Sequence, residues 1–207
     1  SFVAMPGYEW SGNTALGGDR NVYFQNEGRI IRRSSHALIE DQTTADTDCT
    51  TAGELFEAFA ENGEFDVVCY AHCGGRYADI GVAHDGRFEK SVEVHSSWGT
   101  FEWLLHDAFK LGYRVGVVCN SDGHKGRPGA SYPGAGKFGA IGGLTCFSTA
   151  ELSRAALLDC MRKRRHYGTT GGDGGRMVLR MDAAFEGEGT LYHDDPALMD
   201  STSVATR

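Results

Sequence analysis

Short apolar runs, each bounded by glycine or polar residues, recur along this chain and predict buried strands. Runs of this kind, without strict alternation of apolar and polar positions, are typical of the strands of a parallel sheet. The predicted strands are Phe2–Met5, Asn21–Phe24, Val67–Ala71, Val92–Val94 and Val115–Cys119.

Apolar residues at helical spacing fill several of the segments between these strands. A capping box that begins at Thr51 opens one predicted helix, and Phe101–Leu111 repeats the same apolar pattern. A second capping box, at Ser148, predicts a third helix that continues to Gly168. Because strands and helices alternate, the sequence predicts an α/β fold built from βα repeats, either a barrel or an open sheet.

The pattern changes after residue 170. A Gly-Gly-Asp-Gly-Gly run precedes alternating apolar and polar residues at Met177–Met181, and a Gly-rich acidic stretch follows. We therefore predict two parts, a globular unit over residues 1–170 and, over residues 171–207, a Gly-rich linker with a partial β appendage.

Composition narrows the function classes. The chain has 207 residues, of which 41% are hydrophobic, and a net charge of −8 with no long basic run, so extended contact with nucleic acid is not expected. No stretch approaches the roughly 20 apolar residues of a membrane span. The six cysteines form no Cys-x-x-Cys pair, which argues against a zinc ribbon. Cysteines inside apolar runs suggest free thiols in a reducing compartment, so the expected location is the cytoplasm.

Polar residues of metal-ligand type stand at or just after the ends of the predicted strands. In α/β folds, ligands gather where the carboxyl ends of the strands meet. We therefore expect these side chains to converge on one site. They are Glu9, His72, Glu93, His95, Asp122 and His124.

Asp122 and His124 form the sharpest pair. In extended backbone, residues two apart project to the same side, so this carboxylate and imidazole are expected to converge on one ion. A hard oxygen ligand beside an imidazole suits Zn²⁺, Mn²⁺ or Fe²⁺. The alternative is that Asp-Gly-His is simply a turn.

The other candidates also have structural alternatives. His72 is either a ligand or a hydrogen-bonded core histidine, and Glu9 pairs either with a metal or with an arginine such as Arg20. Four more residues are weaker candidates. Glu93 and His95 share strand parity and face either the site or a neighbouring helix, Asp19 is a ligand or a turn residue, and His36 lies in a polar loop where we expect solvent exposure.

Several short motifs, taken in order, resemble the PHP (polymerase and histidinol phosphatase) superfamily of metal-dependent phosphoesterases, and within it the DUF3604-like branch. The resemblance runs from about Met5 to about Gly171. The motifs that carry it are Pro-Gly-Tyr-Glu-Trp-Ser from residue 6, Asp-Arg-Asn-Val-Tyr-Phe from residue 19, Ala-His-Cys-Gly from residue 71, Val-Glu-Val from residue 92, Ser-Asp-Gly-His from residue 121 and Tyr-Gly-Thr-Thr-Gly from residue 167.

This resemblance implies a distorted (β/α)₇ barrel that holds two or three metal ions at its carboxyl-terminal face. Glu9 would match the bridging glutamate of the family, His72 its mid-chain histidine, and Asp122 and His124 its closing pair. Asp19 stands where relatives carry a histidine. The family's opening His-x-His motif is absent here, so we expect a barrel that is incomplete at its N-terminus and completed by a missing segment or another chain, or a protein that has lost its first metal site.

The resemblance implies a phosphoesterase that hydrolyses a small phosphorylated substrate with a metal-activated water. Lys125 and Arg127, which follow the Asp122–His124 pair, are expected to contact the phosphate oxygens. Three alternatives stay open: a barrel of this type that hydrolyses an amide or lactone, a non-catalytic binding module, and an ordinary α/β domain without a metal.

Overall fold

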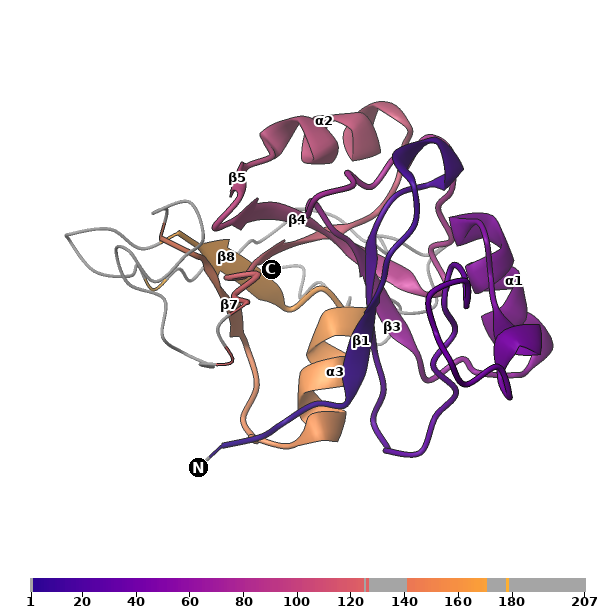
Figure 1. Cartoon of the computed structure of the whole chain (residues 1–207). Helices are drawn as coiled ribbons and strands as arrows, with labels where there is room; N and C mark the ends of the chain where they lie inside the picture. The colour runs from indigo at the N-terminus through magenta and orange to yellow at the C-terminus, as the bar shows by residue number, and fades with distance from the viewer. Residues whose placement is uncertain (1, 125, 127–140, 171–177, 179–207) are drawn as a thin grey trace, which may run out of the picture.

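A computed structural model describes residues 2–124, 126, 141–170 and 178 (Figure 1). Its strands are β1 Gly7–Trp10, β2 Arg20–Tyr23, β3 Val68–Ala71, β4 Glu89–Ser96, β5 Gly99–Thr100, β6 Gly116–Cys119, β7 Leu144–Phe147 and β8 His166–Thr169. Its α-helices are α1 Ala52–Glu61, α2 Glu102–Lys110 and α3 Arg154–Arg162, and short 3₁₀ turns lie at Thr14–Leu16 and Ala45–Thr47.

Six of these strands form one mixed sheet. β1 pairs with β2 and β2 with β3 in antiparallel fashion, whereas β3 pairs with β4 and β4 with β6 in parallel fashion. The two-residue strand β5 runs antiparallel to the end of β4. β7 and β8 form a separate antiparallel pair.

Side chains alternate across the sheet and so define two faces. On the first face, Val22 and Cys69 pack against α1, and Val92 packs against α2. On the second face, Val68 and Tyr70 pack against α3. Figure 1 shows α2 at the top, α1 at the right and α3 below the central strands. The sheet is therefore covered by helices on both faces.

The capping box predicted at Thr51 is confirmed. The Thr51 hydroxyl accepts a hydrogen bond from the Glu54 backbone N–H at 3.1 Å, and the Glu54 carboxylate accepts one from the Thr51 N–H at 3.3 Å. The helix that follows buries one apolar face against the sheet, namely Ala52, Leu55, Phe56 and Phe59. This face and its cap explain why the segment is helical.

The prediction of a distorted (β/α)₇ barrel is wrong. A barrel of that type needs parallel strands that close into a ring, with a helix after each strand. Here β1, β2 and β3 run antiparallel to one another, and the described residues contain three α-helices and no closed barrel. The fold class is instead mixed α/β with an open six-stranded sheet. The predicted C-terminal β appendage and linker, residues 171–207, lie outside the described residues apart from position 178.

Two predicted elements also differ from the structure. Phe2–Met5 is not a strand, and the first strand is instead Gly7–Trp10, so Glu9 lies within β1 rather than after a strand. The third helix is capped by Ser153 and ends near Arg164, which has a left-handed φ of 55°. His166–Thr169 then forms β8, because these residues pair with β7. Among the described residues, no helix is long and apolar enough to cross a membrane.

Candidate metal site

Three of the predicted ligands meet at one point in the structure. Glu9, His72 and Asp122 each offer one ligand atom, and these atoms lie within 4.8 Å of one another. Nε2 of His72 is 3.9 Å from Oε2 of Glu9 and 3.6 Å from Oδ2 of Asp122. This is the one group of its kind in the part of the chain that the structure describes.

The sheet explains why these residues converge. Glu9 is paired with Asn21, which is paired with Tyr70 across the next strand, so Glu9 lies on the second face. His72 directly follows β3 and continues the alternation of Val68 and Tyr70 on that face. Asp122 lies in the loop after β6, on the far side of β4. Residues from three separate segments thus reach one place.

His72 is buried, and its two ring nitrogens have different surroundings. Nδ1 lies 3.0 Å from the buried Glu93 carboxylate, whereas the buried Nε2 has no hydrogen-bond partner. Burial alone lowers the pKa of His72, but the Glu93 hydrogen bond and the nearby carboxylates of Glu9 and Asp122 outweigh it and raise the pKa to about 9. The site therefore attracts a cation at Nε2, whether a proton or a metal ion.

Glu93 lies behind His72 rather than beside the Glu9–His72–Asp122 group. It is fully buried, and its Oε2 also accepts a hydrogen bond of 3.0 Å from the side-chain amide of Asn120. A carboxylate bonded to the far nitrogen of a histidine orients the imidazole and raises its basicity toward a metal. The structure thus assigns Glu93 a positioning contact, and Asn120 in turn holds Glu93.

Asp19 is buried close to the group but is engaged with Arg76. Its Oδ2 accepts a 3.2 Å hydrogen bond from the Arg76 backbone N–H, and its Oδ1 is 3.4 Å from the Arg76 Nε. Burial, together with the Glu9 carboxylate, raises the pKa of Asp19 to about 6. A side-chain carbon at Gly74 would lie 2.9 Å from Nε2 of His72 and 3.4 Å from Oδ2 of Asp19, so glycine leaves room beside both.

His124 does not join the group. Its imidazole is half-exposed, and Nδ1 lies 2.8 Å from the backbone carbonyl of Asp122 and 3.8 Å from Oδ1 of that residue. The segment is not extended, because β6 ends at Cys119 and Asp122 has a left-handed φ of 47°. The rule that residues two apart share a side therefore does not apply here.

The other histidine candidates lie elsewhere. His95 has its two ring nitrogens 3.0 Å from the Thr100 hydroxyl and 2.8 Å from the Ile141 carbonyl. The register of β4 against β6 shifts between Glu93 and His95, so the parity that suggested a shared direction is lost.

His36 is buried, so the expected solvent exposure is wrong. Its Nδ1 is hydrogen-bonded to Asp48 and its Nε2 lies 3.2 Å from the Thr44 hydroxyl. The polar loop around it supplies these partners. Lys125 and Arg127, the predicted phosphate contacts, lie outside the described residues.

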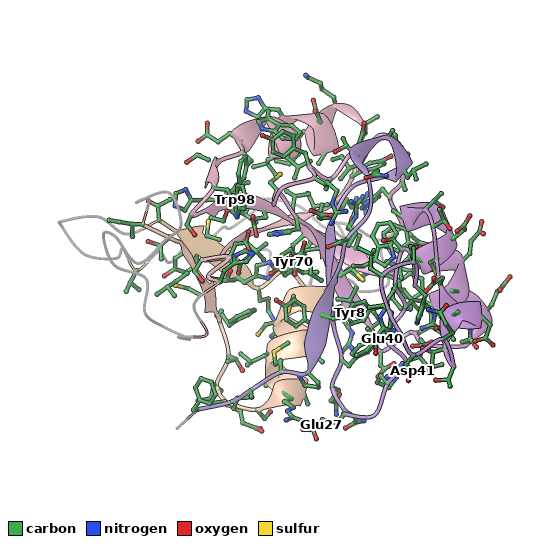
Figure 2. The ribbon with its side chains drawn as sticks, in the orientation of Figure 1. Tyr8, Glu27, Glu40, Asp41, Tyr70 and Trp98 are labelled. Carbon is green, nitrogen blue, oxygen red and sulfur yellow. The ribbon has the colours of Figure 1, made fainter. Side chains whose placement is uncertain are left out.

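A pocket of about 500 Å³ opens beside the group. His72, Glu93 and Asp122 line it, together with Asn120 and Tyr70. Figure 2 shows Tyr70 near the centre of the molecule. The sequence interpretation missed Asn120 and Tyr70, although the spacing of Tyr70 and His72, two apart in an apolar strand, was a signal that they share a face.

Comparison with known proteins adds nothing to this picture. A scan against models of protein families, a search of curated proteins and a search of solved structures each found no match. The resemblance to the PHP superfamily therefore stays a prediction, and the side chains of the site are the basis for a proposed function.

Proposed function

We propose that this protein is a metal-dependent hydrolase, with Glu9, His72 and Asp122 as protein ligands of a divalent metal ion. The reaction that we propose first is the hydrolysis of a phosphate ester. One observation carries the proposal: Nε2 of His72 is buried without a hydrogen-bond partner while two carboxylates lie within 4 Å of it. A buried polar atom without a partner requires an explanation, and a cation among these three groups would satisfy Nε2 of His72 together with both carboxylates.

The ligand atoms fit a transition metal. One imidazole nitrogen and two carboxylate oxygens are a donor set that suits Zn²⁺, Mn²⁺ or Fe²⁺. A bound divalent ion would supply a Lewis acid and lower the pKa of a coordinated water toward neutrality. Catalytic sites of this type leave one or more positions free for water or substrate. We propose one ion at this group, because the described residues contain a single such set.

The chain's own residues would prepare the site. Glu93 and Asn120 hold the His72 ring so that Nε2 faces the two carboxylates. Ser11 donates a 3.1 Å hydrogen bond to Oε1 of Glu9, which leaves Oε2 directed at His72. The pocket beside them gives a substrate access to the group. A small phosphate ester is the substrate class that we propose.

The same site also fits a second reaction, hydrolysis of an amide or lactone. The observation that favours it is that the described residues lining the pocket include no lysine or arginine, so they offer no cationic contact to a phosphate. A panel of phosphate esters, amides and lactones, assayed with the same metal-loaded protein, separates the two reactions.

Metal content measured by plasma mass spectrometry tests the proposal directly. Protein purified without chelator should carry about one zinc, manganese or iron per chain, and His72→Gln and Asp122→Asn should carry much less. His106→Gln is the matched control, because His106 is exposed on α2, away from the group. Hydrolysis of phosphate esters should disappear with chelator and return with added metal. Metal-free wild type that also hydrolyses nothing when metal is added would refute the proposal.

A further inference from the structure

The pocket beside the metal group has an apolar side that the proposed hydrolysis does not itself require. Val118 and Met161 are buried in its wall, and Phe147 packs against the same cluster. Tyr70 belongs to this cluster and lines the same pocket as Glu93 and Asp122. The apolar wall is thus continuous with the charged end of the pocket.

Tyr23 and Tyr70 form an ordered aromatic surface in this wall. Their rings stack with centroids 5.6 Å apart and an interplanar angle of 25°, and their hydroxyl oxygens lie 3.0 Å apart. One hydroxyl donates to the other, so the pair has one O–H hydrogen left for a further acceptor. Both residues line the pocket.

We propose that this pocket binds an aromatic or similarly apolar substituent of the substrate. The ester that is cleaved at the metal site then carries this substituent beside its phosphoryl group. The inference rests on the proposed function. A volume of about 500 Å³ lies within the roughly 300–1,000 Å³ of small-molecule sites and accommodates a ring together with a phosphoryl group. An apolar substituent gains from leaving water for such a wall, whereas a phosphoryl group by itself does not.

Two phosphonates, which cannot be hydrolysed, separate the contribution of the ring from that of the anion. Titration calorimetry of Mn²⁺-saturated protein should show that phenylphosphonate binds on the order of tenfold to a hundredfold more tightly than methylphosphonate. Phe147→Ala should bring the two affinities together without weakening methylphosphonate. Leu144→Gln changes an exposed position that also lines the pocket, so it tests the same wall without a risk to the core. This variant should likewise bring the affinities for the two phosphonates closer together.

Phe109→Ala is the matched control, since Phe109 is 62% exposed on α2 and does not line the pocket. It should leave the ratio of the two affinities unchanged. Equal, metal-dependent binding of both phosphonates by the wild type overturns this inference and leaves the hydrolase proposal standing. If neither phosphonate binds to protein that has bound Mn²⁺, the proposed phosphoesterase function fails, and the inference fails with it.

Discussion

Two clusters of charged side chains lie on this sheet, the first buried and the second only partly buried, and they differ in how their charges balance. In the first, Arg20 forms an ion pair with Glu89, and Glu89 also lies 2.7 Å from the Nδ1 of His84. The Arg20 guanidinium donates further hydrogen bonds to backbone carbonyls, among them those of Gly17 at 2.6 Å and Ala83 at 2.9 Å. A full cation thus matches the buried carboxylate.

The second cluster is the candidate metal site. Three carboxylates, those of Glu9, Glu93 and Asp122, surround the single imidazole of His72. Even a protonated His72 leaves an excess of negative charge, and its Nε2 has no hydrogen-bond partner. The two clusters thus differ: the first is complete within the chain, whereas a divalent cation would offset two of the three negative charges of the second.

The largest expected effect is on the first cluster. Arg20→Met removes the cation and leaves Glu89 fully buried without it, which should lower the free energy of unfolding by about 3–5 kcal/mol. Chemical denaturation measures this directly. The double variant Arg20→Met/Glu89→Met removes both charges and should recover most of the loss. A single variant that unfolds like the wild type would contradict a structural role for this pair.

A smaller effect is expected at the second cluster, where Glu93 acts through His72. Glu93→Gln keeps the shape but removes the negative charge behind the imidazole, so metal affinity should fall by roughly 10–100-fold. Competition with a chromogenic chelator measures this affinity. Glu102→Gln, at an exposed position in the first turn of α2, is the control and should bind metal like the wild type. Unchanged affinity in Glu93→Gln would mean that Glu93 does not tune His72.

Local signals in the sequence predicted several elements correctly. The capping box and apolar face of α1, and the buried runs that became β3 and β6, depend on residues close together in the chain. The direction in which strands pair depends on contacts between distant segments, and an apolar run does not encode it. The barrel prediction assumed parallel neighbours, whereas β2 runs antiparallel to both β1 and β3.

The difference between local signals and contacts of distant segments also applies to the candidate metal site. Glu9, His72 and Asp122 were predicted from polar residues at strand ends, and the structure brings these three together. His124 and His95 were predicted from side-chain parity, which fails where the backbone leaves the extended conformation. Asp122 has a left-handed φ of 47°, and the register of β4 shifts before His95. A turn at Asp-Gly-His was an alternative that the sequence left open, whereas the register shift before His95 has no clear signal in the sequence.

A further expected effect is the pH dependence of stability, because in the metal-free protein a proton can occupy the position at His72 where the metal ion would bind. In metal-free protein the pKa of His72 is raised to about 9, whereas an unfolded histidine titrates near 6.5. A raised folded-state pKa stabilises the fold fully below about pH 6.5, and this contribution is lost as the pH rises through about 9. The denaturation midpoint of chelated protein should therefore fall across this window.

His72→Gln is the control, because subtracting its profile removes the contribution of the other titrating groups. Metal-saturated protein should show no such fall, because a bound metal keeps His72 deprotonated throughout. Chelated wild type and His72→Gln with parallel profiles would show that the excess negative charge of the second cluster does not hold a proton at His72, and the contrast between the two clusters would then be lost.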